Sequence, residues 1–357
     1  MKKILFVMIF VAMIGNISCN KERIEPGQHP SIDVDIPNSP LHDCPYLVGI
    51  PGTFLLDMAI DNNHVFYFIT EEFGLISPPW SSYLPIKGYL SRKTDETGKF
   101  EILFKYFGAK MCFDKNNQLW LMNSNTVYKV DGSSFNRTKI FETSGMLQFI
   151  AVDNDNNIWT GGLQTGLYKI DDKMNVTQHT VNNPDLPTNS MTNIHIDKNN
   201  NIWVALWDSQ GVLKISNGQW VVYNSLNSEI TSQNIWCLVT DKNGHLWIGT
   251  GHDNENQSLM RFDGTQWETV IPRNDKNEIV TGTVRRIQSD GNKIYVVSEK
   301  VKNKAFYSNE LLTFDGLKWD KIFEIPEDDG IDDLIVDDHL KVVWVRTLNK
   351  GIFKIPF

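Results

Sequence analysis

The chain has few cysteines, no metal-binding histidine pattern and no basic cluster. Only four of its 357 residues are cysteine, and no two form a CxxC pair, which argues against a disulfide framework or a zinc site. The eight histidines show no ligand spacing such as HExxH. The formal net charge is −9 and no run of Lys and Arg occurs, which argues against nucleic acid as a partner. We therefore expect no metal and no cofactor.

No apolar run reaches the length of about 18 residues that a membrane span needs. The run at residues 4–14 follows Lys2 and Lys3 and predicts a signal peptide over residues 1–18. Cys19 follows in a stretch, 16–19, that resembles a bacterial lipobox, except that Asn16 replaces the usual Leu. We expect lipidation of Cys19, the alternative being an ordinary signal peptide with Cys19 unmodified.

Residues 19–44 contain four prolines and scattered charges, which predict an extended tether. Together with a lipidated Cys19, this predicts an exported lipoprotein of a bacterial envelope. Its lipid would be the only anchor, and the protein would face the periplasm or the cell surface.

A heptapeptide that begins with Asp and ends with Trp occurs four times, at 114–120, 153–159, 197–203 and 241–247. The tryptophans lie 39, 44 and 44 residues apart, and a fixed period of this size indicates a repeat architecture. In the clearest unit, 191–223, turns rich in Asp, Asn and Gly join four short apolar segments. Each unit is therefore expected to be a sheet of four hairpin-linked strands.

Degenerate copies extend the array to seven units. They are expected at about 54–104, 108–140, 147–180, 191–224, 234–270, 284–322 and 331–357. The last unit has three strands, and residues 46–50 would supply the fourth and so join the two chain ends. The sequence predicts an all-β fold, a closed seven-bladed β-propeller of four-stranded antiparallel blades over residues 45–357.

The units resemble the two-component regulator propeller repeat. The segments 246–250 (Leu-Trp-Ile-Gly-Thr) and 262–264 (Phe-Asp-Gly) carry the resemblance best, and 157–162 with 166–167 is close. In that family, propellers form periplasmic sensors of hybrid histidine kinases that respond to glycan fragments. No kinase or DNA-binding pattern appears in this sequence, so we expect a stand-alone sensor-type lipoprotein. A weaker resemblance to streptogramin-lyase-like and lactonase-like propellers leaves a metal-dependent hydrolase or lyase as an alternative.

Functional residues are expected where the aligned units stop repeating. The position three residues before each turn Asp is apolar throughout, whereas the positions four and five before it vary. Because these positions would lie at the mouth of the central channel, we predict a ligand site there. Its residues are Asp57, Lys110, Gln148, Asn193, Trp236, Arg285, Arg286, Asp332 and Asp333. The alternative is that they are only solvated strand ends.

Longer loops add Trp80 and Tyr83, from a predicted loop over residues 70–87, and also Trp207, His252 and Asp253. Aromatic faces beside charges suit a sugar or another polar ring. We therefore expect a non-enzymatic propeller that binds a polar small molecule, a glycan or an envelope protein, with a protein-interaction scaffold as a further alternative.

Two features bear on the enzymatic alternative. A lactonase-like metal site would use Asp57, Asn193 and Asp333, but Lys110 and Arg286 in the same ring would repel a cation. His195 lies inside an apolar strand and is expected to be a packed core histidine rather than a catalytic base.

Overall fold

The computed structural model describes most of the chain beyond residue 52. The described residues are 53–75, 83–93, 100–106, 108, 110–182, 186–230, 235–250, 259–274, 276, 282–302, 305–325, 330–347 and 352–357. All of them belong to one unit, Ser31–Phe357. This part of the chain forms strands, and none of its residues form a helix that could cross a membrane. The predicted signal peptide, Cys19, the tether and the strand at 46–50 lie outside these residues.

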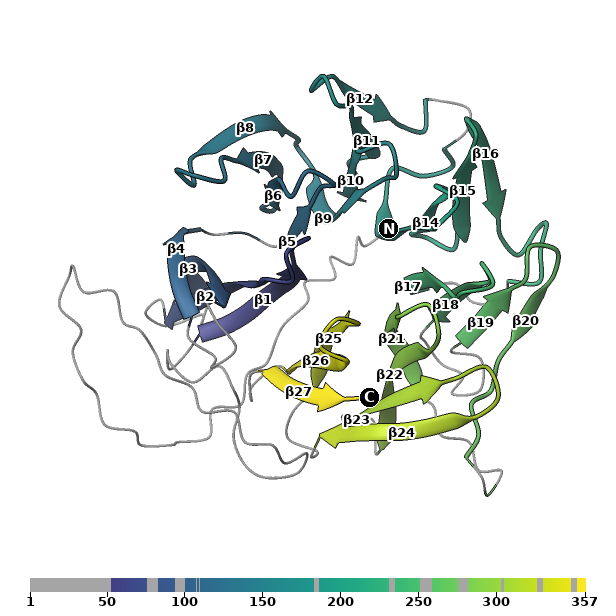
Figure 1. The fold of residues 1–357 in the computed structure, drawn as a ribbon. Helices are drawn as coiled ribbons and strands as arrows, with labels where there is room; N and C mark the ends of the chain where they lie inside the picture. Colours follow the sequence, from purple (N-terminus) through teal and green to yellow (C-terminus); the bar gives the residue numbers. More distant parts are fainter. Residues whose placement is uncertain are drawn as a thin grey trace, which may run out of the picture. The chain divides into compact units, whose positions relative to one another are not determined.

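The described strands form seven antiparallel sheets around a central axis, which confirms the predicted propeller (Figure 1). Blade 1 consists of β1 (Thr53–Ile60), β2 (Phe66–Leu75), β3 (Tyr83–Lys93) and β4 (Phe100–Lys105). Blade 2 consists of β5 (Lys110–Phe113), β6 (Leu119–Met122), β7 (Thr126–Val130) and β8 (Arg137–Glu142). Blade 3 consists of β9 (Met146–Val152), β10 (Ile158–Leu163), β11 (Leu167–Ile170) and β12 (Val176–His179).

The remaining blades continue in chain order. Blade 4 consists of β13 (Met191–Ile196), β14 (Ile202–Leu206), β15 (Val212–Ser216) and β16 (Gln219–Tyr223), and blade 5 of β17 (Ile235–Thr240), β18 (Leu246–Thr250), β19 (Leu259–Phe262) and β20 (Trp267–Thr269). Blade 6 consists of β21 (Thr283–Ser289), β22 (Ile294–Lys302), β23 (Ala305–Phe314) and β24 (Trp319–Ile325). Blade 7 consists of β25 (Ile331–Asp337), β26 (Val342–Thr347) and β27 (Ile352–Pro356).

The first strand of every blade lines the axis. Each of these innermost strands packs against the next one, and β25 of the last blade packs against β1 of the first. The ring is therefore closed by contacts within the described residues. Blade 7 has three strands there, and whether residues 46–50 add the fourth stays a prediction because they lie outside the described part.

The repeated Asp and Trp residues hold each blade together. In blade 4, Asp197 Oδ1 accepts backbone N–H groups from Asn199 and Asn201 at 2.9 and 2.8 Å, and Asp197 Oδ2 accepts the Trp203 indole N–H at 3.1 Å. Lys214, the cross-strand partner of Trp203, places Nζ 4.9 Å from the ring centroid. Blades 2, 3, 5 and 7 repeat the Asp–Trp bond at 3.1, 2.8, 3.1 and 3.3 Å. The residues that reveal the repeat are therefore structural.

Neighbouring blades are also tied through their first hairpins. The backbone N–H after one blade's turn Asp donates to an Asn side chain in the next hairpin, and that Asn has a positive φ, which Asn tolerates better than most residues. The bonds are Asn62 N to Asn117 Oδ1 (2.8 Å, φ 59°), Lys115 N to Asn156 Oδ1 (2.9 Å, φ 65°) and Asn154 N to Asn200 Oδ1 (2.6 Å, φ 62°). These turns form a ladder across blades 1 to 4.

The predicted long loop over residues 70–87 was wrong for most of its length. Strand β2 continues to Leu75 and β3 begins at Tyr83, with these two residues opposite each other. The register shifts beside Phe73, which pairs with Pro85, and such a bulge lets a strand accommodate proline. Trp80 lies outside the described residues, as do His252 and Asp253.

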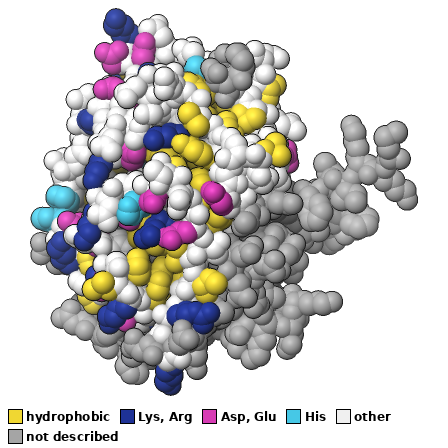
Figure 2. All heavy atoms as spheres, turned by 90° about the vertical axis from the view of Figure 1, so that its right-hand side faces the viewer, with side chains coloured by type: hydrophobic (Ala, Val, Ile, Leu, Met, Phe, Trp, Pro, Cys, Tyr) yellow, Lys and Arg dark blue, Asp and Glu magenta, His cyan; other side chains and the backbone are white. Residues whose placement is uncertain are grey.

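The outer edge of the ring mixes apolar and charged side chains. On the side that carries β16 and β20, apolar groups alternate with Lys, Arg, Asp and Glu (Figure 2). Val221 of β16 and Leu226 just beyond it are the exposed apolar residues nearest this strand, with 43% and 93% of their surface accessible.

Candidate functional site

Six of the seven innermost strands carry a β-bulge at the same place. The register between first and second strand shifts by one residue there, and the extra residue is Leu56, Gln148, Thr192, Trp236, Arg285 or Asp332. A bulge bends its strand and redirects side chains, and bulges are frequent beside functional sites. These residues are the ones five before the turn Asp, so the variable sequence positions coincide with a shared distortion of the backbone.

Asp57, Lys110 and Asp333 join blades 1, 2 and 7 at this level. Lys110 Nζ lies 2.7 Å from Asp57 Oδ1 and 3.6 Å from Asp333 Oδ2. The second oxygen of Asp57 accepts the backbone N–H of Met111 at 2.8 Å. The two carboxylates, far apart in sequence, thus share one cation, as ring closure requires.

Two arginines extend this cluster into blades 6 and 7. Arg346 Nη2 lies 2.6 Å from Asp332 Oδ2 and 3.6 Å from Asp333 Oδ2. Arg286 makes longer contacts, with Nη2 3.6 Å from Asp332 Oδ1 and Nε 3.7 Å from Asp333 Oδ1. The side chain of Arg286 is 33% exposed and that of Arg346 only 5%. We call the three acidic and three basic residues, Asp57, Lys110, Arg286, Asp332, Asp333 and Arg346, the charge cluster.

The pairing determines which groups in the charge cluster stay ionised. Burial would raise the pKa of Asp333, but Lys110, Arg346 and Arg286 outweigh it and lower that pKa. Burial opposes charge on Lys110 too, yet Asp57 and Asp333 prevail and raise its pKa. For Asp57, burial dominates over Lys110 and raises the pKa of the carboxyl. Lys110 therefore keeps its charge near neutral pH.

An aromatic pair lies beside the charge cluster. Arg285, next to Arg286, places Cζ 5.5 Å from the ring centroid of Trp236 and Nε 2.8 Å from Glu299 Oε2. The ring of Trp207 lies 5.7 Å from that of Trp236 at an angle of 79°. Both indoles are partly exposed. We call Trp207 and Trp236 the aromatic shelf.

The other predicted residues are more dispersed. Gln148 is the bulge residue of β9 in blade 3. Asn193 braces blade 4 against blade 5, because its Nδ2 donates to the Trp236 carbonyl at 3.2 Å and its Oδ1 accepts the Ile194 N–H at 2.7 Å. Tyr83 is the first residue of β3. The structure thus brings Asp57, Lys110, Arg286, Asp332 and Asp333 together, and Arg285 with Trp207 and Trp236.

Sequence reasoning missed Arg346 and Glu299, which lie on second strands. Arg346 occupies the position two residues after the blade's aromatic. The other second strands have small or apolar residues there, namely Ile69, Met122, Gly161, Ala205, Gly249 and Val297. An alignment of second strands on their aromatic residue would have revealed this arginine.

The residues considered for a metal site or a catalytic base contact other protein groups in this structure. Among the described residues, no three His, Cys, Asp or Glu side chains form a group that could hold a metal. Asp57 and Asp333 both contact Lys110. His195 Nε2 accepts the backbone N–H of Thr240 at 3.1 Å and lies 2.8 Å from its hydroxyl, while burial lowers the pKa of His195 to about 4. His195 is thus a packed, neutral link between blades 4 and 5, as predicted.

One family model matches the chain, that of the two component regulator propeller, over residues 229–252. Residues 229–252 carry the two-component regulator propeller repeat. The match includes the first hairpin of blade 5 and the segment 246–250, one of the two that carry the sequence resemblance best, and it ends before 262–264. No curated protein sequence matches the chain.

Solved structures with a related fold include the extracellular domain of a one- or two-component system protein, a lyase and a secretion-system component. The extracellular domain of BT4673 from B. thetaiotaomicron, a protein described as a one-component system, is 18% identical with a TM-score of 0.57; the alignment covers 88% of this chain and 41% of that one. This chain therefore spans about two fifths of that domain.

Two further propellers come from other proteins. A catalytically inactive virginiamycin B lyase from Staphylococcus aureus, solved with quinupristin, is 10% identical with a TM-score of 0.62, covering 92% of this chain and all of that one. PorZ, a surface component of the type-IX secretion system of Porphyromonas gingivalis, is 16% identical with a TM-score of 0.58, covering 84% and 46%. At these identities the likeness shows a shared fold.

Proposed function

We propose that this protein is a non-enzymatic binding propeller whose channel mouth takes a polar, ring-containing ligand such as a glycan fragment. The observation that carries the proposal is the aromatic shelf lying beside a charge cluster of balanced sign. Trp207 and Trp236 stand almost perpendicular and offer two ring planes, onto which the C–H face of a sugar can pack.

Arg286 is the cation best placed to bind such a ligand. Its ion-pair distances of 3.6 and 3.7 Å exceed the hydrogen-bond range of about 2.7–3.2 Å. Nη1 donates to the Arg285 carbonyl at 3.0 Å, so Nε and Nη2, which make the longer contacts, are the groups that can turn to a ligand hydroxyl or carboxylate. Lys110 and Arg346, in contrast, hold short bonds to Asp57 and Asp332.

Binding to a glycan array tests the proposal. Wild-type protein should bind a subset of oligosaccharides, and Trp236→Ala and Arg286→Ala should each weaken that binding by about tenfold or more. Lys139→Ala, an exposed change in the outer strand β8, is the matched control and should bind like the wild type. Absence of binding across a broad array, or equal binding by all four proteins, would refute the proposal.

We also propose that the chain is exported and held to a membrane by a lipid on Cys19. The support is the sequence pattern at residues 2–19 and the likeness of the propeller to domains described as extracellular. Metabolic labelling with a palmitate analogue tests the anchor. Wild type should take up the label and Cys19→Ser should not, and labelling of both would show that another residue is modified.

A protein partner is the second candidate, favoured by the exposed apolar residues Val221 and Leu226 at the outer edge of blade 4. Crosslinking in the native envelope would capture the same partner with wild type and with the channel variant Trp236→Ala. Capture should fall in the double variant Val221→Asp, Leu226→Asp. Capture lost in Trp236→Ala instead would place the partner at the channel mouth.

A further inference from the structure

Blade 6 has Tyr295 in place of the fastening tryptophan, and its hydroxyl donates to Asp290 Oδ2 at 2.9 Å. Blade 1 also lacks the tryptophan that fastens the other five blades. Tyr67 occupies its place and packs toward blade 2, as Trp203 of blade 4 packs toward blade 5. The phenol hydroxyl of Tyr67 is bonded to Arg92. Asp61 Oδ2, whose counterparts accept an indole N–H in five blades and the Tyr295 hydroxyl in blade 6, here accepts Asn117 Nδ2 at 3.1 Å. The blade keeps the Asp and the cross-strand cation of the repeat but has no indole between them.

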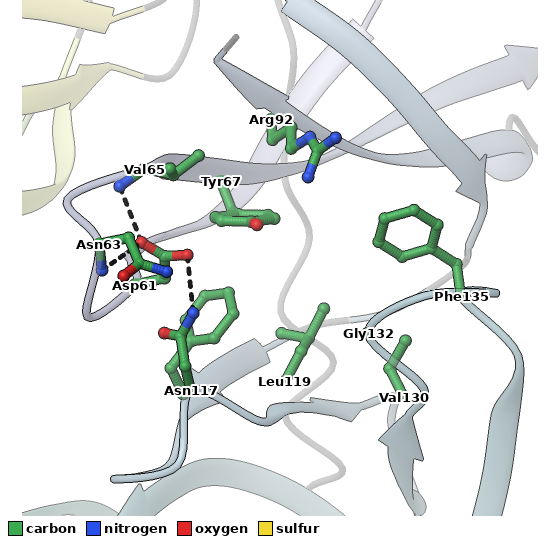
Figure 3. A pocket seen from close by; sticks show the side chains of 11 residues that line it. Asp61, Asn63, Val65, Tyr67, Arg92, Asn117, Leu119, Val130, Gly132 and Phe135 are labelled. Carbon is green, nitrogen blue, oxygen red and sulfur yellow. Dashed lines mark hydrogen bonds between the residues drawn. The ribbon is translucent and has the colours of Figure 1, made fainter.

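A pocket of about 250 Å³ opens at this position, between blades 1 and 2. The rings of Tyr67 and Phe135 flank it, Leu119 and Val130 line its base, and Arg92 points into it from above (Figure 3). Asp61, Asn117 and Gly132 belong to hairpins at the opposite ends of the strands from the bulges of the channel mouth. The pocket is therefore separate from the charge cluster and the aromatic shelf.

The Phe135 wall of the pocket is held in an unusual backbone conformation. Phe135 has a φ of 55°, a left-handed value that is an outlier for a bulky residue. The turn is closed by a 2.9 Å bond from Phe135 N to Asp131 O, and Arg92 Cζ lies 5.8 Å from the phenyl centroid. Strain of this kind is often retained at ligand sites. Here the left-handed conformation directs the Phe135 ring toward the space that an indole would fill.

We propose that this pocket binds a small planar aromatic molecule that carries an N–H or O–H donor. Such a molecule would take the place of the missing indole. Its ring would lie between Tyr67 and Phe135 with Arg92 as the cation beside it, and its donor would be directed to the carboxylate of Asp61. The pocket is smaller than the roughly 300–1,000 Å³ typical for drug-sized ligands, which favours a ligand of one or two rings.

Indole is the probe, and saturation-transfer NMR on the full chain is the measurement. Wild type should show saturable binding, and cyclohexanol, which has a donor but no aromatic ring, should bind at least severalfold more weakly. Tyr67→Trp fills the pocket with the residue found in blades 2 to 5 and 7, so it should abolish indole binding while the melting temperature stays level or rises. Trp236→Ala, at the channel mouth, should bind indole like the wild type.

Phe135→Asn provides a second test, because Asn adopts a positive φ readily but removes the ring wall. It should weaken indole binding severalfold and leave the fold intact. If Tyr67→Trp fails to fold, the indole affinity of Phe135→Asn is the test of the proposal. Absence of saturable indole binding to the wild type, or unchanged binding in Tyr67→Trp and Phe135→Asn, would overturn the proposal. Because Trp236→Ala is expected to leave indole binding unchanged, the indole experiment tests this pocket alone. A negative result here would not refute the proposed ligand site at the channel mouth, and a negative glycan result would not refute this pocket.

Discussion

Arg346 of β26 stands directly opposite Asp333 of β25, and its Nη2 atom bridges Asp333 Oδ2 at 3.6 Å and Asp332 Oδ2 at 2.6 Å. Its side chain is almost fully buried, whereas Asp332 is one-third exposed. Arg346 is therefore the fixed counter-charge behind carboxylates at the channel mouth. It leaves Arg286, with its longer contacts, as the cation that can respond to a ligand.

Removal of Arg346 should destabilise the protein strongly. Arg346→Met leaves Asp332 without its closest cation and Asp333 without one of its three, and breaking a buried pair in this way costs about 3–5 kcal/mol. Arg346→Lys keeps the charge and should recover part of that loss. Urea unfolding measures both, with Arg286→Met as the matched control, which should cost less because Arg286 is more exposed and less tightly paired. An equal cost for Arg346→Met and Arg286→Met would contradict this account.

The Asp of the repeat should matter for stability rather than for binding. Asp197→Ala removes the acceptor for two backbone N–H groups and leaves the buried Trp203 indole N–H without its partner, which should cost about 3 kcal/mol. Thermal unfolding would measure the loss, and Asp172→Ala, an exposed hairpin change, should have little effect. Ligand binding by the folded Asp197→Ala protein should match the wild type, and its loss would give Asp197 a role at the site.

The repeat made the fold predictable because Asp and Trp serve the same contacts in most blades. The hydrogen bond from Trp203 to Asp197 recurs in blades 2, 3, 5 and 7, and the degenerate copies of the motif completed the predicted count of seven blades. The variable position five before the Asp coincides with the bulges, and a ligand site at this level stays a prediction. Ring closure predicts that Asp57 and Asp333 become neighbours with Lys110 beside them, and the two ion pairs of Lys110 confirm this. Arg346 was missed because it lies on a second strand.

The hairpin ladder predicts a difference between two substitutions at one residue. Asn156→Gly keeps the backbone free to adopt φ 65° and loses the bond from Lys115 N, so it should cost about 1 kcal/mol or less. Asn156→Ala should cost about 1 kcal/mol more, because a left-handed φ is unfavourable for Ala. Gly244 already occupies this position in blade 5 with a φ of 84°. Chemical denaturation of both variants tests the order, and equal losses would show that the conformation relaxes.

His195 should make the protein less stable in acid. Its pKa is about 4 in the folded protein against an ordinary value of 6.5, because burial disfavours the imidazolium and Nε2 already accepts the Thr240 N–H. Above pH 6.5 the residue is neutral in both states and contributes no pH dependence. Between pH 6.5 and 4 the unfolded chain binds a proton that the folded protein excludes, so stability falls as pH falls, by about 3 kcal/mol in all.

His195→Gln isolates this effect, because Gln does not titrate and its side-chain oxygen can accept the Thr240 N–H. Urea unfolding of both proteins from pH 7.5 to 4 should show the wild type losing its advantage over the variant as the pH falls. The other histidines are common to both proteins and cancel in the difference. Two parallel curves would mean that His195 takes up a proton equally well in the folded and unfolded states. The link between blades 4 and 5 would then not depend on a neutral imidazole.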